Sequence, residues 1–374
     1  MLFKMINKFL NIVLVICIGN WTFFNTVSKN EIIHSIKVFH KGISLTESVD
    51  CNLIEVQNEY QQPIEYYMDV ESVVCGDNHC KVDFVRIFWD IFGQYKRFEL
   101  PDKVKLEKAE GKDFTAEDYE KLNSILHDEN SSLKDVYKHE IVSTVGTEGI
   151  DALSGSTILL EKSAYVKGAV WTCYSLWHWV HGDIKQIIRN ITGKSQSIKS
   201  LQSYLSSNKK VKKLFGLEQL NHRKDYSEKS VQLVVSAIEQ SSTLLKPSLL
   251  YLENAPNKVY INTIQKLLKQ FESENRLFCL QHLLKTKQKL PLEFYYKLSD
   301  LYKDFTYQEI HVLLKILNTK YDISPQMINH LLPLLNHNDF LIARRLYWFL
   351  QKQDLLQEQE SRIQTFYLEW KDKL

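Results

Sequence analysis

The stretch that decides the fold of the first half of this chain is Val82–Trp89, which reads VDFVRIFW. β-Branched and aromatic residues dominate it and show no helical period, so it predicts a strand. Its second half has bulky residues on both faces, which is typical of a strand covered from both sides. The turn Asp90–Gly93 follows, in which glycine supplies the permissive backbone conformation, and Gln94–Leu100 is then predicted as the next strand.

Further strands are predicted around this hairpin. Val70–Cys75 precedes Cys80–Trp89 across a short turn, and together with Gln94–Leu100 these segments predict a three-strand antiparallel meander. Ile32–His40 and Val49–Val56 are short and rich in β-formers, and we expect two earlier strands there.

The composition indicates a mixed, helix-leaning protein of two or three domains. Of the 374 residues, 44% are hydrophobic and 25% are charged, which excludes the disordered, collagen-like and disulfide-dense classes. Only 12 glycines and 7 prolines are present, and this argues against a turn-rich all-β barrel. The net charge of +2 gives no global reason to bind nucleic acid.

Helices are expected on both sides of a further β segment. Thr115 is a predicted N-cap, with Asp118 three positions on and an apolar stripe after it. Glu140–Val145 is predicted as a strand. Glu161–His181 is apolar around most of its circumference and ends before Gly182, so we expect a central, buried helix there.

Residues 185–224 differ from the rest of the chain in charge. They contain ten Lys or Arg residues against one acid, Glu218, a net charge of +9 that is densest at Lys209–Lys213. The pattern predicts a solvated basic linker over 185–226. Contact with anionic lipid or with an acidic partner is the alternative, whereas sparse aromatic residues give no support for nucleic-acid binding.

From about Ser227 onward the apolar residues recur at helical spacing. Three similar stretches, Asn275–Leu280, Tyr307–Val312 and Asp339–Arg344, follow one another at a spacing of about 32 residues. The sequence therefore predicts an α+β domain over residues 30–184, with an antiparallel meander and a central helix. An all-α, solenoid-like domain of HEAT-like repeats is predicted over 227–374.

The first residues resemble an export signal. Two lysines, Lys4 and Lys8, precede the apolar run Phe9–Phe24, so residues 1–28 are predicted to be a secretory signal peptide. No small-x-small cleavage site is evident, and an uncleaved membrane anchor is the alternative.

Export would favour disulfide formation. Cys75 and Cys80 flank a predicted hairpin turn, which would bring their sulfur atoms together, and we expect a structural disulfide between them. A metal site that also uses His79 and a redox-active cysteine pair are the alternatives.

The segment Asp151–Thr157, DALSGST, is the candidate functional motif. Ser154, Ser156 and Thr157 offer three hydroxyl groups, and Gly155 lets a ligand approach the backbone closely. The N–H groups of a following helix would favour a phosphate at this position. A capped helix start without any ligand explains the same residues.

This segment resembles the attachment motif of the FMN-binding domain in the C subunit of the sodium-translocating NADH:quinone reductase. It is also similar to the motif in the G subunit of the related electron-transport complex. Asp151, Ser154, Gly155 and Thr157 match the motif, whereas Ser156 replaces its alanine. The resemblance implies an FMN joined to Thr157 by a phosphoester, made by a separate flavin transferase. It also implies a site in the periplasm or at the outer face of the cytoplasmic membrane.

The resemblance suggests roles for further residues. Ser154 or Ser156 would donate hydrogen bonds to phosphate oxygens, and Asp151 would fix the turn or be recognised by the transferase. The isoalloxazine ring would stack on Trp171, Tyr174 or Trp177, which would otherwise be ordinary helix core. His178 and His181, three positions apart, would form a metal pair or simply pack.

Two hypotheses about function follow. The first is an exported electron-transfer module carrying covalent FMN, docked to a helical-repeat scaffold and working with a redox or envelope protein partner. The alternative is a cofactor-free envelope scaffold or protein-interaction protein with the same fold. A hydrolase acting through Ser154 would need a glycine pattern and a base that the sequence does not supply, and no catalytic residue is assigned.

Overall fold

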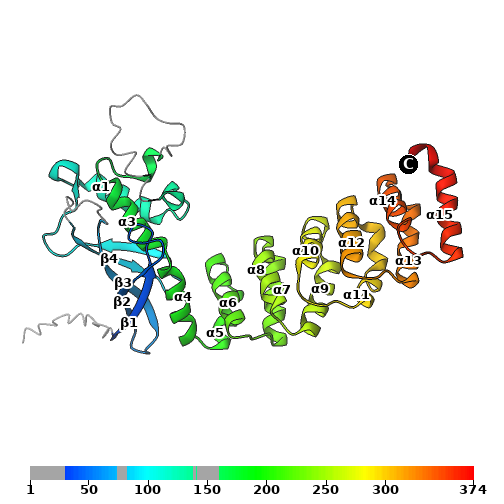
Figure 1. Ribbon diagram of the computed structural model, residues 1–374. Coiled ribbons are helices and arrows are strands. Elements are labelled where there is room, and N and C mark those ends of the chain that lie inside the picture. The colour runs from blue at the N-terminus through cyan, green and yellow to red at the C-terminus, as the bar shows by residue number, and fades with distance from the viewer. Residues whose placement is uncertain (1–29, 74–81, 138–139, 141–159) are drawn as a thin grey trace, which may run out of the picture.

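The computed structural model describes residues 30–73, 82–137, 140 and 160–374. In these residues an antiparallel sheet with helices packed on it is followed by a long, curved succession of helices that leads away from the sheet (Figure 1). We call these helices, from Ile184 onward, the array. The predicted fold class, an α+β part followed by an all-α part with the character of a solenoid, is confirmed.

The sheet is a simple meander in which each strand pairs antiparallel with the next along the chain. Its strands are β1 (Asn30–Phe39), β2 (Ser48–Gln57), β3 (Pro63–Glu71), β4 (Phe84–Trp89) and β5 (Tyr95–Glu99). Two short strands, β6 (Glu107–Lys108) and β7 (Lys112–Asp113), pair separately. The predictions for β1, β2, β4 and β5 are confirmed, whereas the strand predicted at Val70–Cys75 overlaps β3 only at Val70 and Glu71.

One face of the sheet forms a core with two helices, α1 (Ala116–His127) and α3 (Val170–His181). Alternate residues of β3 and β4 point into this core, among them Met68, Ile87 and Trp89. The Trp89 indole Nε1 donates a 3.1 Å hydrogen bond to the carbonyl oxygen of Val180, which ties the end of α3 to the sheet. On the other face, the Arg97 guanidinium covers the Phe88 ring at 3.6 Å.

The two helices of this core begin differently. Thr115 caps α1 through the predicted box, because the Asp118 N–H donates to Thr115 Oγ1 and the Asp118 carboxylate accepts from the Thr115 N–H. For α3, the predicted start at Glu161 is wrong. Residues 162–164 form one 3-10 turn, and Gly168 has φ of +78°, a left-handed conformation that separates this turn from the helix.

The expected basic linker is helical, and this corrects the prediction for 185–226. These residues form α4 (Ile184–Ser195), α5 (Ile198–Leu205) and α6 (Lys210–His222). Leu201, Phe215 and Leu220 are fully buried in the core of the array. The all-α part therefore follows α3 directly, at Ile184.

The helices of the array alternate between two rows. The first row contains α6, α8 (Leu245–Glu253), α10 (Ser273–Lys285), α12 (Tyr307–Lys320) and α14 (Phe340–Leu350), each packed against the next. The second row contains α5, α7 (Glu228–Gln240), α9 (Asn257–Gln270), α11 (Leu292–Tyr296), α13 (Pro325–Leu331) and α15 (Gln357–Trp370). The starts of α10, α12 and α14 at residues 273, 307 and 340 agree with the predicted repeat length.

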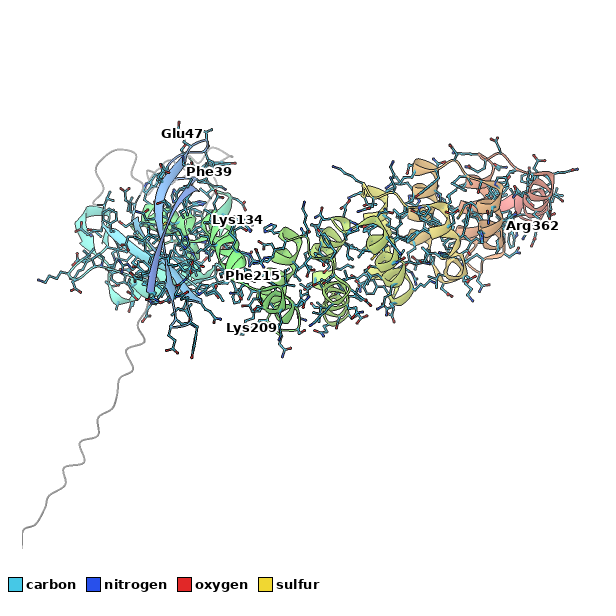
Figure 2. All side chains as sticks on the ribbon, turned by 90° about the horizontal axis from the view of Figure 1, so that it is seen from below. Phe39, Glu47, Lys134, Lys209, Phe215 and Arg362 are labelled. Carbon is cyan, nitrogen blue, oxygen red and sulfur yellow. The ribbon has the colours of Figure 1, made fainter. Side chains whose placement is uncertain are left out.

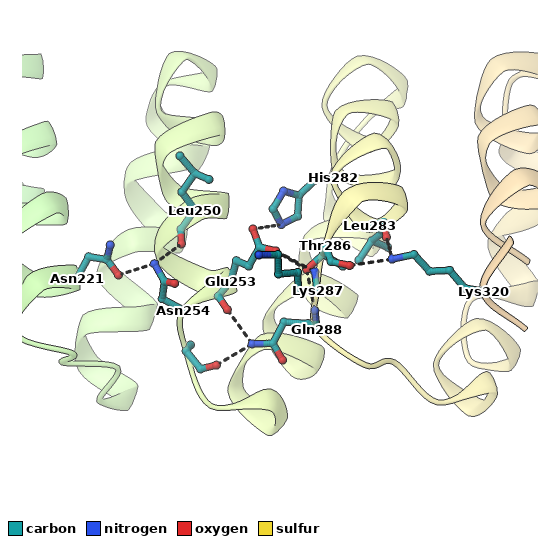
Figure 3. A network of polar contacts seen from close by, with 11 residues as sticks. Asn221, Leu250, Glu253, Asn254, His282, Leu283, Thr286, Lys287, Gln288 and Lys320 are labelled. Atoms are coloured by element: carbon teal, nitrogen blue, oxygen red, sulfur yellow. Dashed lines mark hydrogen bonds and ion pairs between the residues drawn. The ribbon is translucent and has the colours of Figure 1, made fainter.

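Polar side chains join successive helices of the first row (Figure 3). The Glu253 carboxylate, at the end of α8, accepts from Thr286 Oγ1 at 2.8 Å and from the Lys287 N–H at 3.1 Å. Lys320 Nζ in turn donates to the carbonyl oxygens of Leu283 and Thr286, at 2.8 and 2.9 Å. These contacts fix α8, α10 and α12 in a defined stacking register.

The sheet and the array meet at the turn between β4 and β5. Phe92 in this turn packs edge-on against Phe215 of α6, with ring centroids 5.2 Å apart, and Phe215 marks this junction in Figure 2. Arg189 Nη1 donates to the Phe92 carbonyl at 3.3 Å. Arg362 on α15 lies at the opposite end of the molecule in the same view.

Candidate functional site

The predicted attachment motif lies outside the described residues. This applies to Asp151, Ser154, Gly155, Ser156 and Thr157, and also to the predicted disulfide pair, Cys75 and Cys80. The described chain resumes at Leu160, and α3 follows the 3-10 turn at 162–164.

Of the three aromatic residues proposed to stack on a flavin, two lie inside the core of the α+β part. Tyr174 is 0% exposed and Trp177 is 3% exposed. The Trp177 indole also donates a 2.9 Å hydrogen bond to the Asp128 carbonyl, which holds the ring in place. Trp171 is half-buried, with its ring 6.2 Å from that of Tyr174. In this conformation Tyr174 and Trp177 do not fit a stacking role, whereas Trp171 has an accessible part.

The two histidines of α3 have different surroundings. His181 Nε2 lies 2.9 Å from the Leu126 carbonyl oxygen. His178 lies between the rings of Tyr174 and Trp177, and its pKa is lowered to about 3, first by burial and then by His40 and Lys41. Among the described residues, no group of three or more His, Cys, Asp or Glu side chains could hold a metal ion.

A group of buried polar atoms surrounds this part of α3. Tyr174 Oη, His178 Nε2, Trp179 Nε1 and Ser132 Oγ are buried and have no hydrogen-bond partner among the described residues. Buried polar groups are normally hydrogen-bonded, so such a group is unusual in a protein core. His40 packs against it, with its ring 4.4 Å from Trp179 and its Nε2 2.9 Å from the Ser175 carbonyl oxygen.

Several basic side chains of residues 185–224, the predicted linker, form hydrogen bonds or ion pairs inside the array. Arg189 pairs with Glu218, at 2.8 Å from Nε, and Lys213 Nζ donates to Gln240 at 2.6 Å. Arg223 donates to the carbonyl oxygens of Gly193 and Lys194. These bonds stabilise the contacts between helices, so only part of the predicted basic surface faces solvent.

A first groove lies between the sheet part and the helices α4, α6 and α8. Its volume is about 730 Å³, and Glu129, Lys185, Glu218 and Leu250 are among its lining residues. Lys185 Nζ pairs with Glu129 at 2.8 Å, and Arg189 pairs with Glu218. The charges in this groove therefore largely compensate one another.

A second groove, of about 720 Å³, lies between α12 and α14 and has a different character. Four of its lining side chains are basic, namely His311, Lys315, Arg345 and Lys352, and none is acidic. Among the described residues, Lys315, Arg345 and Lys352 form no ion pair, and Arg345 Nε is buried without a hydrogen-bond partner. We call this site the α12–α14 groove.

The α12–α14 groove also offers apolar and amide groups. Leu314, Trp348 and Phe349 line it, and Trp348 is 42% exposed. The Arg344 guanidinium lies 5.1 Å from the centre of the Trp348 ring. Asn318 and Gln351 contribute amide groups that both donate and accept hydrogen bonds.

His311, which lines this groove, has an altered ionisation to which the neighbouring positive charges contribute. Burial, followed by the charges of Arg345 and Lys315, lowers the pKa of His311. An anion bound in the groove would oppose this shift.

The groove residues were not among the site residues predicted from the sequence. The signal was weak: α12 has one acid, Glu309, which is fully buried against Arg276, and α14 has none. The other feature of the sequence that pointed to a binding surface was Trp348, which lies on the exposed face of the amphipathic helix α14.

Comparisons with known proteins give no match from which a family or a function could be inferred. A scan against protein-family models gives no match, and searches of the curated proteins and of the solved structures find none either. Among the described residues, no helix is both long and apolar enough to span a bilayer.

Proposed function

We propose that this chain is an interaction protein, in which a small α+β domain carries a helical-repeat array that binds a protein partner on its first row. The supporting observation is the position of the large exposed apolar side chains within residues 184–350. All of them lie on first-row helices: Leu250, Phe278, Tyr307, Leu341 and Trp348.

The second-row helices α5 to α13 have no large exposed apolar side chain, whereas α15, the last helix of that row, exposes Tyr367 and Leu368. Isolated exposed apolar residues are common and need no explanation. Over α5 to α14 they are restricted to one row of stacked helices. This is the pattern expected of a binding surface, because exposed apolar side chains are unfavourable in water unless a partner covers them.

The proposal can be tested with a photo-crosslinking amino acid placed in the full chain in its native cells. Positions Leu250 and Phe278 sample the first row, and Lys258 and Lys266, both exposed on α9, are matched second-row controls. We expect a discrete protein adduct from the first-row positions only. Equal labelling from both rows, or no adduct from the first row, would contradict the proposal.

We also propose that this interaction takes place outside the cytoplasm, in the periplasm or at the outer face of the membrane. Support comes from the basic and apolar pattern of residues 1–28. Cell fractionation with mass analysis of the intact protein tests this. Recovery of the chain from the cytoplasmic fraction, with Cys75 and Cys80 both alkylated without prior reduction, would argue against export.

A second candidate function is the carriage of covalent FMN at Thr157, as an electron-transfer module docked to the same array. One specific observation favours it, the match of Asp151, Ser154, Gly155 and Thr157 to the attachment motif. Bound FMN would supply electron-transfer chemistry. Because Tyr174 and Trp177 are buried, Trp171 is the aromatic residue of the three that remains available to contact it.

Co-expression with a flavin transferase tests this second function. A denaturing gel viewed under ultraviolet light should show a fluorescent band that Thr157→Ala abolishes and Ser156→Ala retains. A dark wild-type band, next to a fluorescent control substrate of the same transferase, would remove the flavin function and leave the scaffold function standing.

A further inference from the structure

We propose that the α12–α14 groove is the site where the array binds an acidic segment of its protein partner, with an apolar side chain of that segment seated against Trp348. This inference rests on the proposed function and adds to it a location and the chemistry of the ligand.

The charge of the ligand follows from the lining of the groove. Lys315 of α12, Arg345 of α14 and Lys352 in the turn after α14 line the groove, and none of its lining side chains is acidic. Cations that face each other without counter-charges repel, and a carboxylate placed between them relieves this repulsion.

The class of the ligand follows from the other lining groups. Leu314 and Phe349 give the groove an aliphatic and aromatic wall, which suits an apolar side chain of a peptide. Asn318 can pair with a peptide N–H and a peptide C=O at once, and the Gln351 amide, whose nitrogen donates to the Tyr347 hydroxyl, can still accept from a peptide N–H. A phosphate polymer would use the cations but has no side chain for this wall, so the groove favours an acidic protein segment.

The position of the groove fits partner binding by the array. α12 and α14 are adjacent in the first row, next to α10, which carries the exposed Phe278. A segment bound in the groove could continue along the row toward α10. The groove is far from the sheet, since α14 lies near the C-terminal end of the array (Figure 1).

The test measures binding of a fluorescein-labelled, glutamate-rich peptide containing leucine to the full chain by fluorescence anisotropy. The variant is Lys315→Gln with Arg345→Gln. The matched control is Lys266→Gln with Lys269→Gln, which removes the same charge from exposed positions of α9. Circular dichroism and thermal unfolding verify that each variant is folded, and Lys352→Gln replaces the double variant if that one does not fold.

We expect the groove variant to weaken peptide binding about tenfold and the control to change it less than about twofold, with Arg345→Lys restoring part of the loss. Equal weakening by both variants, or no binding by the wild type, would overturn the inference. Tighter, groove-dependent binding of oligothymidylate or of phosphatidylglycerol vesicles would overturn the assignment to a protein segment. Crosslinks from Leu250 and Phe278, which lie outside the groove, test the proposed function separately.

Discussion

His178 is a residue through which the structure predicts a marked dependence of stability on pH. Its folded-state pKa of about 3 lies below the ordinary value of 6.5, so the unfolded chain binds the proton more readily. Stability from this group is therefore fully present above pH 6.5 and decreases as the pH falls toward 3.

We expect the free energy of unfolding to fall by about 2 kcal/mol between pH 7 and pH 5 on account of His178. Urea denaturation across this range should show that His178→Gln flattens the dependence. The same slope in His178→Gln and wild type would show that another group is responsible.

His311 gives the α12–α14 groove a pH dependence of its own. The pKa of this imidazole is lowered in the free protein, by burial and by Arg345 and Lys315. A bound carboxylate would raise it again, so binding takes up a proton and affinity should increase as the pH falls from 8 toward 6. Peptide titrations should show this trend in wild type and lose it in His311→Asn, and an unchanged trend in the variant would place the peptide elsewhere.

At the scale of elements, residue patterns predicted those features that depend on neighbours along the chain. The strands follow from runs of β-branched and aromatic residues, and the start of α1 follows from Thr115 with Asp118. The start of α3 was mispredicted because the helical pattern was extended upstream through Gly168, whose left-handed backbone separates the 3-10 turn at 162–164 from the helix.

The helices of 184–222 were mispredicted for a different reason. A high lysine content suggested a solvated linker, but Leu201, Leu205 and Phe215 supply a buried stripe beneath the charges. Lysine side chains can lie along an apolar surface with their charge in water, so a basic segment can still form packed helices. The α12–α14 groove could not be predicted, because His311 and Trp348 meet only through the stacking of two repeats.

The buried ion pair between α10 and α12 makes this helix contact sensitive to substitution. Arg276 Nε lies 2.6 Å from Glu309 Oε1, and the Glu309 side chain is 0% exposed. Arg276→Met leaves this carboxylate buried without its counter-charge and should lower the free energy of unfolding by about 3–5 kcal/mol.

Adding Glu309→Gln to Arg276→Met provides the matched test. The amide keeps an acceptor for the Thr306 N–H at the start of α12, and it removes the unpaired charge. The double variant should therefore be more stable in urea than Arg276→Met alone. If it is less stable, the buried charge is not the source of the loss.

At the scale of the whole molecule, Gly93 lies where the sheet part contacts the array. Its φ is +74°, and a Cβ at this position would lie 2.6 Å from the carbonyl oxygen of Lys185 in α4. Gly93→Ala should therefore strain the backbone and push the sheet away from the first helix of the array, at a cost of about 2–4 kcal/mol.

Gly111→Ala is the matched control, because Gly111 has φ of +70° but nothing within 4 Å of its added Cβ. The difference between the two variants in urea denaturation isolates the contact with Lys185. Equal losses would mean that backbone strain alone, without the junction, accounts for the effect.

The central claim is that the first row of the array is the surface that binds a partner. Hydrogen exchange of the full chain, with and without the glutamate-rich peptide, tests it most directly. The account predicts slower exchange in α12 and α14, with α9 and the sheet strands unchanged. Protection that appears on α9 or in the sheet but is missing from α12 and α14 would contradict it.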